Sequence, residues 1–190
     1  MRNQIWTMTA RLLAFPAIVD RLIRRAKRTP FTHLHHRDGS YYMRRFWLFN
    51  DWNDVRERRY KLIPFSIRLH HIVTCDQDRE LHDLPWPART IILRGNYTEI
   101  RLEGARRSVN PETDQVHFLG GTEVEYNRFP GDTATLQFEE FHRIIRVSEG
   151  GVWTLFISWP WAGDWGFLVG GVKVWWRKHL GLVKEVRRAH

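Results

Sequence analysis

Cysteine is nearly absent from this sequence: its 190 residues contain only Cys75. A single cysteine cannot form an internal disulfide, a dithiol redox pair or a cluster of thiolate metal ligands. Such sparing use of cysteine favours a reducing compartment, and we therefore expect a cytoplasmic protein.

The sequence also shows no leader pattern and no long apolar run. The start, MRNQIWTMTARLLAFPAIVD, is partly apolar, but Arg11 and Asp20 interrupt it and no small-residue cleavage site follows. Its apolar stretch is much shorter than the roughly 18 residues that a membrane span needs. We expect neither a signal peptide nor a membrane span.

Several catalytic motifs are absent as well. The sequence contains no P-loop, no Gly-x-Ser-x-Gly elbow, no His-Glu-x-x-His helix and no dinucleotide fingerprint. Phosphoryl transfer, serine hydrolysis, zinc proteolysis and dinucleotide binding therefore have no supporting motif.

Acidic residues are scarce at the two ends of the chain, and this scarcity explains the net charge of +9. Residues 1–45 carry ten Lys and Arg against two Asp and Glu, and residues 170–190 carry six against one, whereas residues 46–169 carry 14 against 18. A polyanion such as nucleic acid or anionic lipid, or a host protein, is a candidate partner for these ends. Solvated helix faces are the alternative interpretation.

One helix is indicated near the start of the chain. Pro16 suits a first helical position, and residues 16–29 place apolar side chains on one face and arginines on the other. Pro30 ends the pattern. We expect the apolar face to pack on the domain, with a membrane surface as the alternative.

Short strand-like runs fill most of the remaining chain. They are rich in β-branched and aromatic residues and are separated by Gly and Pro turns, which predicts a mainly β, antiparallel sandwich or barrel. We expect a basic helical segment packed on the barrel over residues 1–40, the barrel over 41–169, and a basic tail with a short helix over 170–190. The predicted strands are 40–49, 60–74, 89–95, 96–102, 115–120, 122–129, 134–138, 142–148 and 152–159.

Two stretches of this β region resemble the two halves of the cupin signature. HDLPWPARTIILRG (82–95) has a histidine, a proline close behind and an apolar strand that ends in a glycine turn. FPGDTATLQFEEFHRI (129–144) has a Pro-Gly-Asp turn, a short strand and a second histidine. The chain is also similar to an uncharacterised cupin-like family of bacteriophages and bacteria that is related to cysteine dioxygenases.

The resemblance covers about residues 60–160 and implies a jelly-roll barrel, often dimeric, with a small-molecule pocket at its mouth. It implies that His82 and His142 are ligands of a divalent transition metal, such as iron, nickel, manganese or zinc. An active enzyme of this kind would be a metal-dependent dioxygenase or isomerase, located in the host cytoplasm if a phage encodes it.

The sequence departs from the cupin pattern at two positions. Leu84 stands where a cupin has its second histidine, and the glutamate position falls at Ala88 or Arg89. Leucine cannot bind a metal, and two imidazoles hold a divalent ion weakly. Either His70 or Glu99 completes the site, or the pocket is degenerate and free of metal.

Arginine and aromatic side chains near these motifs are expected to line the pocket. An aromatic ring can stack on a base or sugar, or can simply fill a wide barrel. An arginine can hold an anion, or can be a surface charge on a strand. The alternative function is a non-enzymatic, phage-type accessory protein that sequesters a nucleotide-like ligand or binds a host protein. The expected pocket residues are Arg68, Trp86, Arg94, Tyr97 and Trp153.

Overall fold

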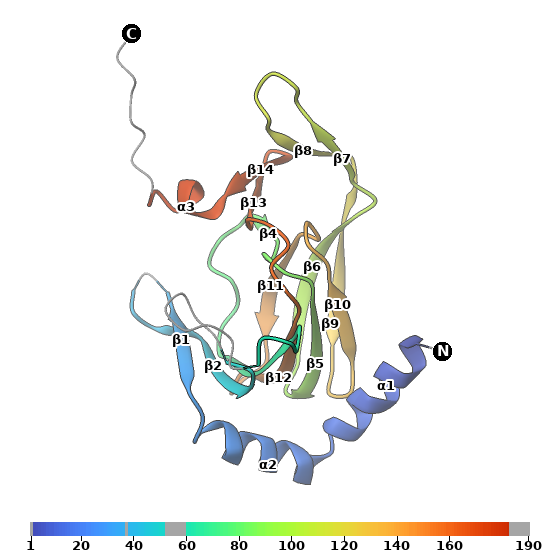
Figure 1. The fold of residues 1–190 in the computed structure, drawn as a ribbon, viewed down its shortest axis with the longest axis vertical. Helices are drawn as coiled ribbons and strands as arrows, with labels where there is room; N and C mark the ends of the chain where they lie inside the picture. Colours follow the sequence, from blue (N-terminus) through green and yellow to red (C-terminus); the bar gives the residue numbers. More distant parts are fainter. Residues whose placement is uncertain (1, 37, 52–59, 183–190) are drawn as a thin grey trace.

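The computed structural model describes residues 2–36, 38–51 and 60–182, and it is mainly β (Figure 1). These residues form two antiparallel sheets that face each other. The expected antiparallel β architecture, with helix at the N-terminal side and a short helix near the C-terminal side, is confirmed. The helices are α1 (Arg2–Leu13), α2 (Pro16–Ala26) and α3 (Trp176–His179).

The first sheet has the strand order β1-β2-β3-β12-β5-β10, and the second has the order β7-β8-β14-β13-β4-β11-β6-β9. All neighbouring strands pair antiparallel. The strands of the first sheet are β1 (Phe31–His35), β2 (Tyr41–Phe49), β3 (Ser66–Ile72), β12 (Val152–Ser158), β5 (Ala88–Arg94) and β10 (Thr133–Leu136). Those of the second are β7 (Arg106–Val109), β8 (Val116–Leu119), β14 (Val172–Trp175), β13 (Gly166–Val169), β4 (Leu81–His82), β11 (His142–Val147), β6 (Tyr97–Glu103) and β9 (Thr122–Arg128).

One part of the core lies between the two sheets. Strand residues alternate between the two faces of a sheet, so each strand sends every second side chain inward. The inward side chains of the first sheet meet those of the second in one buried cluster, which makes the space between the sheets the barrel interior. This cluster contains Ile72, Ile92, Tyr97, Ile144 and Val152.

A second part of the core lies on the outer face of the first sheet, under α1 and α2. Val19 and Ile23 of α2 are buried there against outward side chains such as Leu69 and Ile91. The arginines of α2 point away from the sheet and are exposed. The expectation that this helix packs its apolar face on the domain is therefore confirmed.

The glycine that ends the first motif has a steric role. Gly95 has a φ of +75°, which disfavours residues with a side chain, and a Cβ at this position would collide with the carbonyl of Gly151. The turn after β5 thus packs directly on the turn before β12.

Several elements lie outside the predicted pattern. The helix α1 and the strands β1, β7 and β13 were not expected, and β1 and β14 belong to the sheets although residues 1–40 and 170–190 were assigned to flanking segments. These strands are only four or five residues long, which gives a brief alternation, although β8 and β10 are equally short and overlap predicted runs. The predicted domain boundaries remain predictions. None of the described helices is long and apolar enough to cross a membrane.

Candidate functional site

The two motif histidines are neighbours in the second sheet. His142 opens β11 and lies directly opposite His82 of β4 in the strand register. Their ring centroids are 4.7 Å apart, with an angle of 48° between the ring planes. Antiparallel pairing of a two-residue strand with the start of another thus brings together two side chains that are far apart in the sequence.

The two rings differ in burial. His82 is half-buried, whereas His142 is buried, and its Nδ1 has no hydrogen-bond partner within the described ranges. Burial lowers the pKa of His142 to about 3, and the nearby His82 ring and the Arg101 guanidinium act in the same direction. His142 is therefore a neutral imidazole at ordinary pH.

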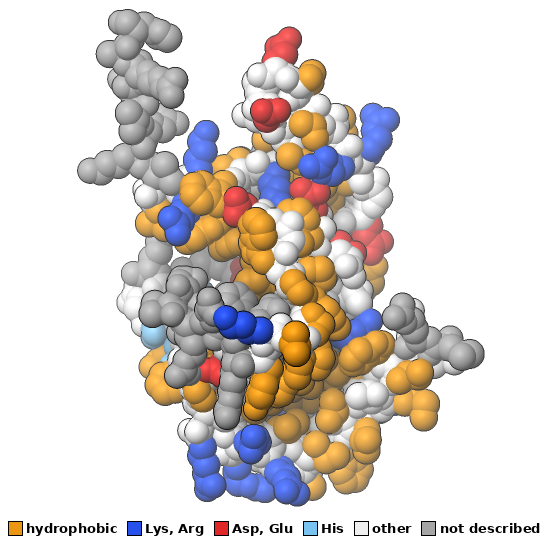
Figure 2. All heavy atoms as spheres, viewed as in Figure 1, with side chains coloured by type: hydrophobic (Ala, Val, Ile, Leu, Met, Phe, Trp, Pro, Cys, Tyr) orange, Lys and Arg blue, Asp and Glu red, His pale blue; other side chains and the backbone are white. Residues whose placement is uncertain are grey.

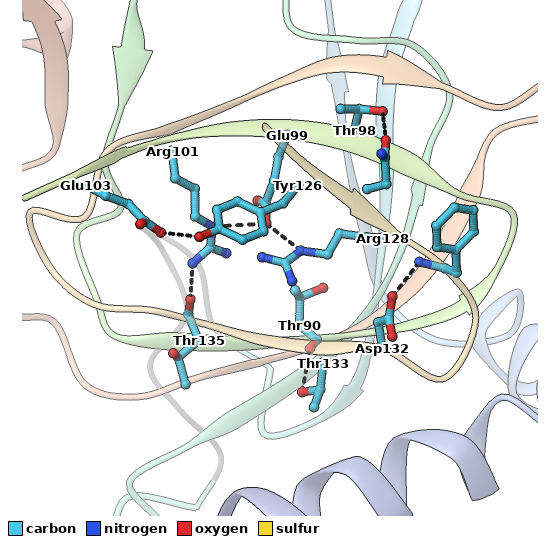
Figure 3. Close-up of polar contacts among 12 residues, drawn as sticks. Thr90, Thr98, Glu99, Arg101, Glu103, Tyr126, Arg128, Asp132, Thr133 and Thr135 are labelled. Atoms are coloured by element: carbon cyan, nitrogen blue, oxygen red, sulfur yellow. Dashed lines mark hydrogen bonds and ion pairs between the residues drawn. The ribbon is translucent and has the colours of Figure 1, made fainter. Parts of the chain in front are cut away.

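A second polar group, centred on Glu99, joins β6 and β9 inside the barrel (Figure 3). The buried Glu99 accepts hydrogen bonds at Oε1 from Nε of Arg101 (3.0 Å) and from Nε of Arg128 (2.8 Å). Arg101 also donates from Nη1 to the carbonyl of Thr135 at 2.7 Å, but its buried Nη2 has no hydrogen-bond partner in the described part of the chain. Because Arg101 faces His142 in the register of β6 and β11, the guanidinium borders the histidine pair.

Aromatic side chains surround His82. Phe167 lies opposite it in β13, with ring centroids 5.8 Å apart, and Trp165 is 6.2 Å away. The helix α3 covers this group, since His179 stacks on Phe167 at 4.1 Å and Trp176 stacks on Trp165 at 5.4 Å. The end of the aromatic segment 158–167 therefore forms a rim beside the histidine pair.

The candidates for a third metal ligand do not join the pair. His70 lies on β3 in the other sheet, where its ring stacks on Phe156 at 4.7 Å. Burial lowers the pKa of His70 well below its usual value, and Arg68 acts in the same direction. Glu99 is held by two arginines. No group of three or more His, Cys, Asp or Glu side chains within the described ranges could hold a metal ion.

The positions of the missing cupin ligands are apolar. Leu84 and Trp86 pack against the buried side chains of Ala88, Leu136 and Phe156. The donor set is thus two imidazoles beside a guanidinium and an apolar cluster. This set does not fit a divalent metal, because working sites use three or four protein ligands.

Three of the expected pocket residues face the barrel interior. The buried Arg68 lies over the rings of Trp47 (4.6 Å) and Trp86 (5.2 Å) and donates to Oγ of Ser158 at 3.2 Å. Burial lowers the pKa of Arg68 to about 9. Tyr97 belongs to the cluster between the sheets, and burial raises the pKa of its hydroxyl.

The other two expected pocket residues, Arg94 and Trp153, lie on the opposite face. Arg94 forms an ion pair with Asp20 of α2 (Nη2–Oδ1 2.5 Å), and Trp153 stacks on His71 at 4.2 Å and packs against the helical core. The prediction that these two line the pocket is wrong. A register shift between β12 and β5 after Trp153 makes the inward positions hard to count from the sequence.

One residue of the site, Arg101, was not singled out from the sequence. Arg101 follows Tyr97 and Glu99 at alternate positions, so strand alternation alone could have placed it inside the barrel. Asp83, adjacent to His82, points away from the ring and accepts hydrogen bonds from Nζ of Lys173 and from the amide of Gly166, both at 2.7 Å.

Comparisons with known proteins bear on the fold. No protein-family model matches the sequence, and no curated protein sequence matches it. Among solved structures, the DMSP lyase DddQ from Ruegeria pomeroyi DSS-3 is similar with a TM-score of 0.50 and 14% identity, over 77% of this chain and 64% of that chain. The fold is cupin-like.

Other solved structures with a cupin fold match this chain with lower TM-scores. One described as the DMSP lyases RdDddP and RnDddQII has a TM-score of 0.49 and 12% identity, over 75% of this chain and 63% of that chain. One of iron(II) HppE has a TM-score of 0.45 and 10% identity, over 70% of this chain and 57% of that chain. The matches span less than two thirds of these longer chains, and the likeness concerns the fold.

Proposed function

We propose that this cupin-like chain binds a small anionic molecule, without a metal, at the end of the barrel interior where His82 and His142 meet. The observation that carries the proposal is the pair of unused polar atoms at this place. Nδ1 of His142 and Nη2 of Arg101 are both buried, and neither has a hydrogen-bond partner among the described residues.

The charge around the pair favours an anion over a cation. Arg101 and Arg128 share one carboxylate, that of Glu99, so these three side chains together carry a net charge of +1. A buried donor without a partner costs about 1–3 kcal/mol, and an acceptor oxygen of a carboxylate or phosphate offsets this cost. A metal ion would instead meet the repulsion of the adjacent guanidinium.

Access from solvent is consistent with a ligand site. His82 is only half-buried and has aromatic neighbours, so a ligand would contact His82 first and the buried donors behind it. Apolar walls with a few converging polar groups are typical of small-molecule sites. Leu84 and Trp86 would supply such a wall.

The test is a thermal-shift screen of inorganic phosphate, sugar phosphates and small dicarboxylates, followed by calorimetric titration of those that stabilise the protein. Arg101→Gln should abolish the stabilisation, because it removes the charge and the unused donor. The matched control is Arg146→Gln, which changes an arginine of β11 whose ion pair with Glu125 is exposed. Wild-type protein that no anion stabilises, or stabilisation that Arg101→Gln leaves intact, would contradict the proposal.

The non-enzymatic alternative, in which the protein sequesters a nucleotide-like ligand or binds a host protein, remains a prediction. If nucleotides are added to the screen, a nucleotide that stabilises the protein through Arg101 would support the sequestration of a nucleotide-like ligand. The relation to metal-dependent dioxygenases also remains a prediction.

A further inference from the structure

The helix α1 has apolar side chains on two faces. Its inner face, which includes Trp6 and Ala10, packs on the first sheet. A second row of large apolar side chains follows helical spacing along the outside and continues just past the helix end. Each member of this row is between 63% and 71% exposed, and the row consists of Ile5, Met8, Leu12 and Phe15.

A contiguous row of exposed, large apolar side chains is unusual on the surface of a soluble protein. Single exposed apolar residues are common, but contiguous apolar patches on soluble proteins mark contacts with a partner or a membrane. Since the inner face of α1 already packs on the domain, folding alone does not account for the outer row.

Basic side chains lie next to this row. The helix α2, which follows α1 directly, points its arginines away from the sheet (Figure 2). The single acidic residue of α1 and α2, Asp20, is engaged by Arg94. The positive charge of this end of the molecule is therefore not neutralised locally. The exposed basic residues are Arg11, Arg21, Arg24, Arg25, Lys27 and Arg28.

We infer that α1 and α2 dock the protein on an anionic lipid surface, with the outer row of α1 inserted at the interface and the basic residues of α2 over the headgroups. Amphipathic elements with this combination of apolar and basic side chains bind the interfacial region of anionic bilayers. The row is convex and flanked by solvent, so it suits a deformable lipid layer and needs no complementary groove.

Charge argues against a second copy of the chain as the occupant. Two copies that met through this face would bring both sets of arginines together, and like charges across an interface are unfavourable. An anionic lipid surface provides the apolar phase and the negative charge at once. The inference is independent of the ligand site, which lies on the other sheet.

The test is co-sedimentation of the full chain with vesicles of phosphatidylcholine alone or of phosphatidylcholine mixed with phosphatidylglycerol. We expect binding to the anionic vesicles, weakened by added salt, and little binding to the neutral ones. The double variant Met8→Glu, Leu12→Glu should weaken binding at least about tenfold, because it places charges in the apolar phase. Arg24→Gln with Arg25→Gln should weaken binding roughly fivefold for each charge removed.

The matched control is Leu119→Glu, which changes an exposed leucine of β8, far from α1 (Figure 1). It should bind like the wild type. Because all substituted side chains are exposed, circular dichroism should show unchanged folding. Absent binding to anionic vesicles, or binding that the Met8 and Leu12 substitutions leave intact, overturns the inference. A wild-type dimer that becomes monomeric in the double variant, without vesicle binding, overturns it in favour of self-association.

Discussion

His142 is a buried neutral base, and this state has a consequence for stability. In the unfolded chain a histidine has a pKa near 6.5, whereas in the folded protein the pKa of His142 is about 3. Between these values the unfolded state binds a proton that the folded state does not bind. The free energy of unfolding therefore falls as the pH is lowered through this window and loses no more from this group below about pH 3.

The first prediction concerns this pH dependence. His142→Gln should reduce the slope of the free energy of unfolding against pH, between about pH 6 and pH 4, by roughly 1.4 kcal/mol per pH unit. Urea unfolding at several pH values measures the slope. The exposed His35→Gln serves as the control and should keep the wild-type slope. An unchanged slope in His142→Gln would show that His142 is protonated in the folded protein.

The second prediction concerns Leu84 and Ala88. Protein purified without a histidine tag should contain far less than one equivalent of iron, nickel, manganese or zinc. Leu84→His with Ala88→Glu should raise metal affinity strongly, because it adds the two ligand types that the cupin pattern has at these positions. Elemental analysis after dialysis measures the metal that the wild type and the double variant retain. One tightly bound equivalent in the wild type, lost in His82→Ala, would contradict a metal-free site.

At the residue scale, motif spacing was the informative part of the sequence. It singled out His82 and His142, which are partners in the structure, although their role as ligands remains a prediction. Arg94 was expected inside the barrel, but its side chain lies on the outer face of the first sheet, where it pairs with Asp20. The register shift beside Arg94 changes the face on which it lies, and such a bulge has no signature in the residue types.

At the scale of elements, a buried ion pair joins β4 to β13 and β14. Asp83 accepts from Lys173, whose side chain is itself largely buried, and from two backbone amides, those of Gly166 (2.7 Å) and Glu139 (3.2 Å). Burial raises the pKa of Asp83, while Lys173 and the amides oppose the shift. The pair connects the strand that carries His82 to the aromatic rim.

The third prediction follows from this ion pair. Asp83→Ala leaves the buried Lys173 ammonium with only the more distant carboxylate of Glu139, at 3.7 Å, and should lower the free energy of unfolding by about 3 kcal/mol. Urea denaturation measures the loss. Glu125→Ala removes a carboxylate from an exposed ion pair and should cost less than about 1 kcal/mol. Equal costs for the two substitutions would mean that Asp83 contributes no more than a surface charge.

Helices and strands with a strong periodic pattern of apolar residues were predicted from the sequence, whereas those with a weak pattern were not. The helix α2 has one apolar and one basic face and was predicted from Pro16 onward. The helix α1 was not, because apolar side chains occur on both its inner and outer faces and produce no single stripe. The nine longer strand-like runs correspond to strands, whereas β4 is two residues long and leaves no periodic signal.

At the scale of the whole molecule, the first sheet separates two buried regions. Its inner face contributes to the barrel interior, and its outer face packs under α1 and α2. The β12 strand serves both regions, with Val152 directed inward and Leu155 directed toward the helices. The helical layer is therefore part of the fold rather than an appendage.

The fourth prediction tests this dependence. Ile23→Ala, beneath α2, should lower the free energy of unfolding by about 2–5 kcal/mol through the lost contacts and the cavity left behind. It should leave anion affinity unchanged, because Ile23 lies on the far side of the sheet from the histidine pair. Urea unfolding and calorimetric titration of the same variant measure the two effects. A stabilising anion that binds the variant many times more weakly would contradict the separation of the two regions.

The composition and turn pattern predicted an antiparallel sandwich or barrel, and the resemblance of two motifs to the cupin signature implied a cupin-like barrel. The division of the chain into helical segment, barrel and tail could not be derived from either. Charge alone suggested that both ends are separate from the barrel. Strand pairing incorporates β1 and β14 into the sheets, and such pairing depends on partners distant in the sequence.

The placement of the helices determines which side of the molecule would face a lipid surface and which would face the solvent. α1 and α2 cover the outside of one sheet, whereas His82, the aromatic rim and α3 belong to the opposite sheet and its end (Figure 1). On a lipid surface held by α1 and α2, the half-exposed face of His82 would look toward the aqueous phase. A ligand would then arrive from solution rather than by lateral diffusion within the bilayer, which suits a charged metabolite and disfavours a lipid.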